Sequence, residues 1–410
     1  MGTTALEGEV YLGAFTWGVL DRLLEAVRDG EIEIDAISGT SAGAMNAAVA
    51  TYGLMTGDAE STRKLLDNFW TSVSRRNLLS PLQEISTQLT GSPDLDNHPA
   101  FIWMEAWKNV LSPQQFNPMN KNPLRDLLNE TIDFETFREL LSEEGGDRLF
   151  IGATNVSKGK PKVFHGDEIS ADAVMASATL PDTFHAVEID GEYFWDGGYM
   201  VNPPLEALRF DDTDDIVLVQ INPFARDEKP RTKKEIADAA NKLMFNAALV
   251  GEIRAIEQLN HLFESGKLKP SAEVRPQRLH RIIDEDRLRD YGHTSKGNTS
   301  MSFLRDLKML GRRAADQWLE EAAPHIGKKS TWEANWANPI EHLGRSKLIA
   351  ETDADDALVN GGDRWAHLRG AATDAMNGTR RPPTVRLRGG KVEPVGDDGI
   401  PQQHQRRAPG

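Results

Sequence analysis

The sequence contains no cysteine among its 410 residues, is short of positive charge, and has no long apolar run. The lack of cysteine excludes disulfides, thiolate metal sites and cysteine nucleophiles. The 47 basic against 63 acidic side chains give a net charge of −16, which argues against a nucleic-acid-binding protein because no overall positive field displaces phosphate counterions. Since we find neither a signal peptide nor a membrane-spanning segment, we expect a soluble, cytoplasmic protein.

Strand-like and helix-like segments alternate along the first 225 residues, and this alternation predicts an α/β fold with a layered sheet. A helix is expected over 13–29, where apolar residues recur at helical spacing before Gly30. A short β-branched run from Ile32 to Ile37 predicts a strand directly after it. The run over 216–221 shows no alternation of apolar and polar residues, which is typical of a strand that is buried on both faces.

The chain is expected to divide into a core and three further segments. The core covers 1–225, with a mostly helical insertion at about 58–145; a helical extension packed on the core covers 226–345, a short helical or irregular segment 346–376, and a tail 377–410. The tail holds five prolines, six glycines, seven basic and three acidic residues, and little apolar content. That composition predicts disorder, and it places basic surface mainly in the tail.

Gly39, Ser41 and Gly43 form a Gly-x-Ser-x-Gly pattern between the predicted strand and an alanine-rich helix. The pattern is typical of a nucleophile elbow, where side chains at the glycine positions would collide with neighbouring backbone and the serine Oγ points outward. The helix that follows directs its N–H groups and positive dipole end toward the serine. Two other interpretations remain open: a phosphate-binding turn, although no lysine follows as in a P-loop, and a serine that only caps the helix.

Asp196, Gly197 and Gly198 follow an aromatic strand candidate, 155 residues after the serine. The glycines permit close approach of backbone, and an aspartate among aromatic residues is partly desolvated, which raises its pKa toward that of a general base. Taken alone, Asp-Gly-Gly is more typical of a hairpin turn. His185 is the nearest histidine in the sequence, and we expect it to be a hydrogen-bonded wall residue rather than a catalytic one.

Together these features resemble the patatin-like phospholipases, a family of lipid acyl hydrolases with a Ser/Asp dyad. An ordinary α/β-hydrolase is disfavoured because only 40 residues precede Ser41. The resemblance implies a three-layer patatin-like sheet flanked by helices, a helical C-terminal extension and a disordered tail. It further implies that Ser41 is the nucleophile and Asp196 the base, without a histidine, metal or cofactor. It is carried by GAFTWGVLDRLLE (13–25), ISGTSAGAMNA (37–47), FIGATNV (150–156), SATLP (177–181) and DGGYMVNPP (196–204).

The oxyanion loop of the family, of the form GGGxxG, is altered in this chain. Aligned on Gly13, the sequence keeps Gly8 but has Glu9 and Val10 in place of the two middle glycines. Loss of one oxyanion donor costs about 10²–10³ in turnover, so either the loop has another register, or the elbow amides suffice, or activity is reduced. The oxyanion and elbow residues implied by the resemblance are Gly8, Gly13, Gly39, Ala42 and Gly43.

The leading hypothesis is hydrolysis of phospholipid, lysophospholipid or acylglycerol esters through an acyl-enzyme. The alternatives are a catalytically weakened lipid-binding or scaffolding relative, and an acyltransferase or thioesterase. The expected partner is the lipid substrate, with membrane contact only peripheral and transient because the acidic body is repelled by anionic surfaces. The acidic runs 211–215 and 353–356 lack EF-hand spacing and are expected to be solvated loops. The candidates for the pocket wall are Phe15, Trp17, Met45, Met175, Phe184 and Trp195.

Overall fold

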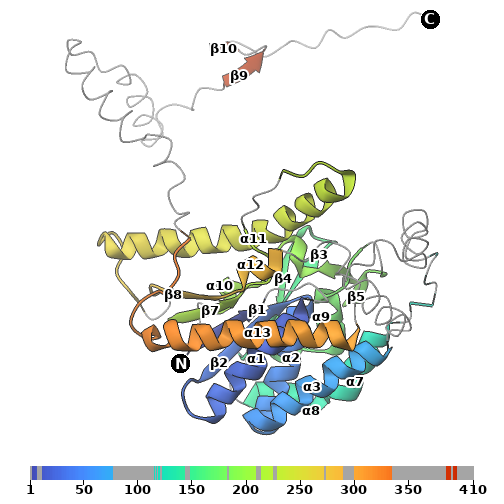
Figure 1. Cartoon of the computed structure of the whole chain (residues 1–410). Coiled ribbons are helices and arrows are strands. Elements are labelled where there is room, and N and C mark those ends of the chain that lie inside the picture. The colour runs from blue at the N-terminus through green and yellow to red at the C-terminus, as the bar shows by residue number, and fades with distance from the viewer. Residues whose placement is uncertain are drawn as a thin grey trace, which may run out of the picture. The chain divides into compact units, whose positions relative to one another are not determined.

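The computed structural model divides into two units, Met1–Asn338 and Pro339–Gly410. The larger unit is built on an eight-stranded mixed sheet (Figure 1). In the smaller unit, the described residues form one antiparallel hairpin. The structure describes residues 2–6, 12–76, 115, 117, 119–120, 122–143, 148–181, 184–208, 214–224, 229–271, 274–289, 300–334, 385–388 and 391–394.

The sheet has the strand order β5-β6-β3-β2-β1-β7-β8, and β4 pairs with β3 off this path. The strands from β3 through β2, β1 and β7 to β8 run parallel, whereas β4, β5 and β6 pair antiparallel. The parallel strands therefore end at one common edge, where β2 leads into its helix. The strand bounds are β1 Gly2–Leu6, β2 Ile34–Thr40, β3 Leu149–Asn155, β4 Lys160–Phe164, β5 Val187–Ile189, β6 Glu192–Asp196, β7 Asp215–Val219 and β8 Arg278–Ile282.

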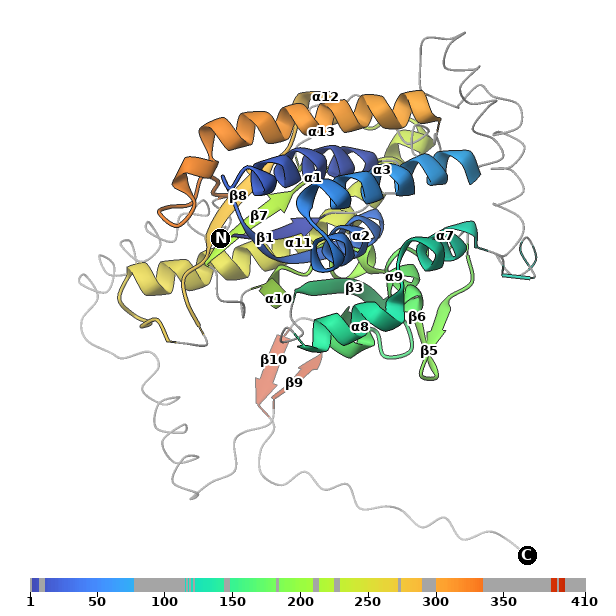
Figure 2. The same cartoon turned by 90° about the horizontal axis from the view of Figure 1, so that it is seen from below.

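Helices cover both faces of the sheet, which makes three layers (Figures 1 and 2). One face carries α1, α2, α3 and α13, and the other carries α10 and α11. The helix bounds are α1 Gly13–Arg28, α2 Ala42–Thr56, α3 Ala59–Arg76, α7 Pro123–Thr131, α8 Phe134–Glu143, α9 Ala171–Ser177, α10 Leu205–Leu208, α11 Lys233–Glu264, α12 Glu285–Arg289 and α13 Met301–Glu321. The short 3-10 helices are η1 Gly166–Glu168, η2 Gly197–Tyr199 and η4 Ala323–His325.

The apolar residues 216–219 of β7 arise because both faces of this strand are covered. Ile216 and Leu218 pack with α10 and α11, while Val217 and Val219 pack with the helices of the opposite layer. Successive side chains of a strand point to opposite faces, so both faces of a strand between two helical layers favour apolar residues. The predicted α/β class and the central sheet flanked by helices are confirmed.

In one layer of helices, α1 and α13 pack in close contact at two glycines. A Cβ on Gly18 would lie 2.0 Å from Lys308 O, and one on Gly311 would lie 2.0 Å from Phe15 O. The two helices lie side by side in both views (Figures 1 and 2). Buried Asp21 of α1 receives hydrogen bonds from Arg63 of α3 and Arg312 of α13, so an ion-pair cluster joins the three helices.

Two parts of the chain differ from the sequence-based expectation. The extension over 226–345 contains the long helices α11 and α13, but it also supplies β8, which pairs parallel with β7 and completes the sheet. Within the tail expected to be disordered, β9 (Val385–Arg388) and β10 (Lys391–Pro394) form a hairpin. Residues 346–376 and most of the residues between α3 and α7 lie outside the described residues, whereas the described parts of the 58–145 insertion form α3, α7 and α8.

Candidate active site

Ser41 lies at the sharp junction between β2 and α2. Its backbone has φ 57° and ψ −125°, a conformation that a residue with a side chain adopts only under strain, and such strain is frequent at active sites. The Ser41 side chain makes no capping hydrogen bond to α2. The interpretation of Ser41 as a helix cap is therefore wrong, and the strained turn has the local geometry of an elbow.

Gly39, the first glycine of the Gly-x-Ser-x-Gly pattern, is required by a close backbone contact. A Cβ on Gly39 would lie 2.4 Å from Gly43 O and 2.6 Å from Gly43 C, distances at which atoms overlap. The chain thus folds back on itself around Ser41, as the sequence pattern predicts. Because Ala44 and Met45 already donate their N–H groups to Ser41 O, the N–H groups of Ala42 and Gly43 are the first of α2 and have no intrahelical acceptor.

The N-terminus of α1 is fixed beside that of α2. A Cβ on Gly13 would lie 2.6 Å from Ala42 Cβ. Buried Asn46 Nδ2 donates to Gly13 O over 2.9 Å, and Trp70 Nε1 donates to Asn46 Oδ1 over 2.9 Å. Both helix ends therefore present positive dipole ends near Ser41, a placement that favours a developing anion. Gly8, Glu9 and Val10 lie outside the described residues, so the altered oxyanion loop stays a sequence-based prediction.

Asp196 lies at the end of β6, fully buried. Its Oδ1 accepts a hydrogen bond from Gly198 N over 2.8 Å, its N–H donates to Thr179 O over 2.8 Å, and its O accepts from Thr154 Oγ1. The residues that follow form η2. The interpretation of Asp-Gly-Gly as a hairpin turn is wrong: the hairpin joining β5 and β6 turns instead at Asp190 and Gly191, both with positive φ.

The residue before Ser41 and the residue after Asp196 are in contact. A Cβ on Gly197 would lie 2.8 Å from Thr40 Cγ2 and 2.3 Å from Gly152 O. Thr40 also pairs with Gly152 of β3, and its Oγ1 donates to Val201 O over 2.8 Å. Two motifs that are 155 residues apart in the sequence therefore meet at one edge of the sheet.

Ser177 links these two motifs, and the sequence analysis assigned it no role. Its Oγ accepts from Ser41 N over 2.9 Å and donates to Gly152 O over 2.5 Å. The side chain is fully buried at the end of α9, so it holds the elbow against β3. The only signal in the sequence was its place in the SATLP segment (177–181).

Ser41 and most of the proposed wall residues are buried. Ser41 is 3% exposed. Four of the proposed wall residues are core residues, whereas Phe184 and Trp195 are half-buried: the buried four are Phe15, Trp17, Met45 and Met175. His185 is half-buried, and its Nε2 has no hydrogen-bond partner in the part of the chain that the structure describes.

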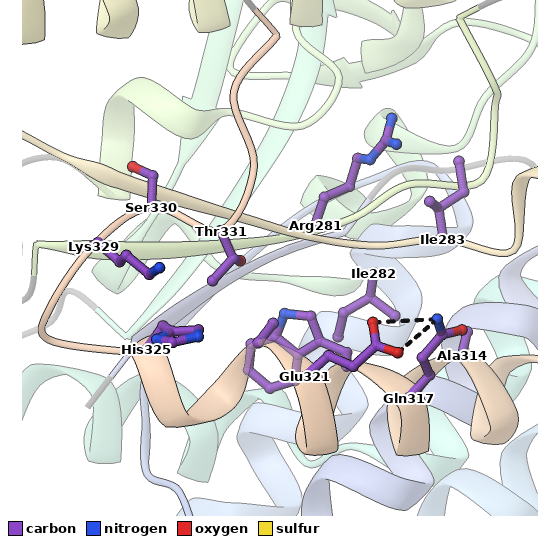
Figure 3. Close-up of a pocket in the computed structure, with 12 residues that line it drawn as sticks. Arg281, Ile282, Ile283, Ala314, Gln317, Glu321, His325, Lys329, Ser330 and Thr331 are labelled. Carbon is purple, nitrogen blue, oxygen red and sulfur yellow. Dashed lines mark hydrogen bonds between the residues drawn. The ribbon is translucent and has the colours of Figure 1, made fainter.

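A cavity of about 460 Å³ lies away from these motifs, between β8, α13 and the segment that follows α13 (Figure 3). Its lining is mostly polar and mixes charges of both signs, among them Glu321, His325 and Lys329. Glu321 accepts a hydrogen bond from Gln317, and Arg281 directs its guanidinium away from these residues (Figure 3). The cavity contains neither Ser41 nor Asp196, so it is not the site that the sequence motifs indicate.

Asp215, from the acidic run 211–215, is not a solvated residue. It is buried, Arg278 donates two hydrogen bonds to its carboxylate, and His280 and Gly327 N also contact it. Burial alone would raise the pKa of Asp215, but these hydrogen bonds outweigh it and lower that pKa. Burial also lowers the pKa of His280, against the opposing effect of Asp215. The expectation of a solvated loop is therefore wrong at this position.

Comparison with known proteins identifies a family. The family model described as patatin-like phospholipase matches residues 5–209, half of the chain. No curated protein matches the sequence. Among solved structures, VipD from Legionella pneumophila is 18% identical with a TM-score of 0.36, over 78% of this chain and 66% of that chain.

The type III effector protein ExoU is 15% identical with a TM-score of 0.33, over 92% of this chain and 65% of that chain. The complex of SpcU with ExoU from the type III secretion system of Pseudomonas aeruginosa gives 14% identity and a TM-score of 0.29, over 92% of this chain and 62% of that chain. This chain thus spans slightly less than two thirds of the length of each of these structures.

Proposed function

Because the chain belongs to the patatin-like phospholipase family, we propose that it hydrolyses carboxylic esters of lipids with Ser41 as nucleophile and Asp196 as base. Membership of this family supports a lipid hydrolase. The observation that carries the proposal is the strained, uncapped Ser41 at the start of α2, with Thr40 in contact with the residue after Asp196. A phospholipid, lysophospholipid or acylglycerol supplies the ester.

The reaction then has two halves. Ser41 Oγ attacks the carbonyl carbon while its proton passes to the Asp196 carboxylate, and the bond to the leaving alcohol breaks as that alcohol takes the proton. Water, deprotonated by Asp196, hydrolyses the acyl-enzyme and restores Ser41. The N–H groups of Ala42 and Gly43 lie at the positive end of α2, where they stabilise the oxyanion of both steps.

The position of Asp196 suits this role for a physical reason. Gly198 N fixes one carboxylate oxygen over 2.8 Å, and the backbone of Asp196 is held by Thr179 and Thr154. A carboxylate held in this way loses little conformational entropy when it accepts the proton, so its orientation is set before the substrate arrives. Ser41 itself is 3% exposed.

Labelling with a fluorophosphonate tests the proposal. We expect wild-type protein to label, Ser41→Ala not to label and to lose about 10⁴-fold or more in turnover, and Asp196→Asn to lose about 10³-fold or more. Ser142→Ala, which changes an exposed serine of α8, is the matched control and should label fully. Folded wild-type protein that does not label, or Ser41→Ala that labels equally, would overturn the assignment. If the wild-type protein labels but, with a lipid ester as substrate, transfers the acyl group to an acceptor instead of to water, the acyltransferase alternative is indicated.

A further inference from the structure

Helix α11 carries apolar residues on two faces, of which only one is covered. The inner face carries buried Phe245, Leu249, Ile253 and Ile256, and the last three pack against the sheet. These positions recur at helical spacing along the middle of the helix. An amphipathic helix on a sheet normally has a polar outer face, and α11 departs from this over its N-terminal turns, where apolar residues are exposed.

Four exposed apolar residues form a stripe on the opposite face, which we call the α11 stripe. Their spacing of i, i+4, i+7 and i+11 aligns them on one side of the helix. Its two large side chains are 52% and 70% exposed. Further along the helix this outer face becomes polar, with exposed Gln258 and His261. The stripe consists of Ile236, Ala240, Leu243 and Ala247.

Phe245 on the inner face of α11 packs directly against the loop that follows Asp196. A Cβ on Gly198 would lie 1.8 Å from Phe245 Cε1, and the rings of Tyr199 and Phe245 are 5.7 Å apart. Met200, the next residue of that loop, is 39% exposed. Leu243 and Ala247 of the stripe flank Phe245 in the sequence but lie on the opposite side of the helix, so whatever covers them lies about one helix diameter, roughly 10 Å, from this loop.

Exposed basic side chains stand at the beginning of this helix. Lys229, Arg231 and Lys233 are all exposed, in a chain whose net charge is −16. The carboxylate of Glu235 is engaged by the N–H groups of Arg231 and Thr232. A cationic end next to an exposed apolar stripe complements an interface of anionic head groups over acyl chains.

We propose that the α11 stripe docks on an anionic lipid surface and so holds the Asp196 side of the site against its substrate. The inference rests on the proposed lipid substrate. A second protein is a poorer fit, because stable protein interfaces use roughly 20–30 residues a side, and two of the four side chains here are alanine. A lipid surface needs only a few apolar side chains at the level of the acyl boundary, with basic groups beside the phosphates.

Flotation with phosphatidylcholine vesicles that contain phosphatidylglycerol tests the docking. The full chain is used with Ser41→Ala, so that hydrolysis cannot change the vesicles. We expect Ile236→Gln with Leu243→Gln to weaken binding about tenfold or more, because two large apolar side chains no longer leave water. Met309→Gln, which changes a 53% exposed residue of α13, is the matched control and should bind as the parent does.

Charge reversal at the helix beginning gives a second, independent variant. We expect Lys229→Glu with Lys233→Glu to weaken binding to the anionic vesicles about tenfold or more, since basic residues near such a surface are attracted to its phosphates and acidic residues are repelled. Vesicles of phosphatidylcholine alone should bind weakly in all variants. Equal loss of binding in Met309→Gln, or unchanged binding in both double variants, would overturn the proposal. A stripe variant that changes from dimer to monomer while its vesicle binding stays unchanged would also overturn the proposal, because the stripe would then contact a second copy of this chain.

Hydrolysis of a soluble short-chain ester separates this inference from the proposed function. In the chain with Ser41 intact, the stripe variant should hydrolyse the soluble ester at the wild-type rate but vesicle lipid at least about tenfold more slowly. If wild-type protein hydrolyses neither substrate yet binds vesicles through the stripe, the proposed function fails and the docking surface stands. If it hydrolyses both and the stripe variant does so equally, the docking surface fails and the function stands.

Discussion

At the residue scale, the strain at Ser41 is the feature that the rest of the site is arranged to hold. A positive φ at a serine costs about 1–3 kcal/mol, and it persists because neighbouring backbone leaves no alternative. Gly39 contributes by having no side chain, and Ser177 contributes by accepting the Ser41 N–H group. Both residues fix the orientation of Ser41, and neither needs to contact a substrate to do so.

Gly39→Ala tests this arrangement because it adds a single Cβ atom to the elbow. The new Cβ would lie 2.4 Å from Gly43 O, and the overlap is relieved only if the elbow opens. We expect turnover to fall about 10²-fold or more, because small displacements of a nucleophile have large effects, and the melting temperature to fall with it. Ester hydrolysis and a thermal melt measure the two effects, and wild-type turnover in this variant would contradict the prediction.

Gly251→Ala is the matched control for that substitution. Gly251 lies within α11, and a Cβ there would have nothing within 4 Å. Alanine is favoured over glycine inside a helix by roughly 0.5–1 kcal/mol, so the control should be slightly more stable and fully active. The comparison separates the effect of close contact from the effect of losing a glycine.

At the element scale, the fit of α1 against α13 decides whether the sheet stays covered. The glycines that let the two helices approach are one on each helix, Gly18 and Gly311. Buried Asp21 of α1 accepts hydrogen bonds from Arg312 of α13 and from Arg63 of α3, so an ion-pair cluster joins these two helices and α3. Because α1 begins at Gly13, beside Ala42, a shift of α1 would reach the candidate site through its own N-terminus.

Gly311→Ala should separate these two helices. Its Cβ would lie 2.0 Å from Phe15 O, and backbone cannot move away without displacing α1. We expect a loss of about 3 kcal/mol in the free energy of unfolding, at the upper end for overpacking, measured by urea denaturation. Arg313→Ala changes the exposed neighbour on α13 and should stay within about 0.5 kcal/mol of wild type. Equal stability of the two variants would show that the helices do not need this contact.

At the scale of the whole molecule, the buried polar cluster around Asp215 ties the far edge of the sheet to the segment after α13. Arg278 and His280 belong to β8, Gly327 follows η4, and His280 Nδ1 lies 2.9 Å from Thr331 Oγ1. The described helices of the molecule include none that is long and apolar enough to cross a membrane. The buried carboxylate of Asp215 thus holds this edge of the sheet through its bonds to Arg278, His280 and Gly327.

This cluster predicts that the free energy of unfolding falls on acidification. Burial lowers the pKa of His280, so the unfolded chain takes up this proton first as the pH falls below the ordinary histidine value of 6.5. The pKa of Asp215 is also lowered, by hydrogen bonds that outweigh burial. Its contribution is present above the ordinary aspartate pKa and is lost as the pH falls through the folded value. Both groups act in the same direction.

Urea denaturation over a pH series measures the effect. His280→Asn removes the histidine proton, so its free energy of unfolding should depend less on pH just below 6.5 than that of wild-type protein. At neutral pH the variant is expected to be less stable, because Asp215 loses a hydrogen-bonding neighbour. An identical pH dependence in the two proteins would show that His280 is not the titrating group.

The sequence by itself determined the local features of the site. The elbow pattern predicted the turn at Ser41, since Gly39 leaves no room for a side chain where backbone folds back on itself this tightly. Periodicity predicted α1 within a few residues, and the apolar run that begins at Ile216 predicted β7. These features depend on neighbours in the chain, and a sequence displays such neighbours directly.

Only the tertiary structure decided which distant residues meet. It brought Thr40 to Gly197, made Ser177 the link between them, and buried Asp215 against Arg278. It also revealed β8, whose short sequence RLHRI (278–282) carries two arginines and a histidine and so lacks the apolar pattern of a central strand. Such contacts depend on how the layers pack against each other. Residues that meet only after packing lie far apart in the sequence, so no periodic pattern in the sequence indicates that they meet.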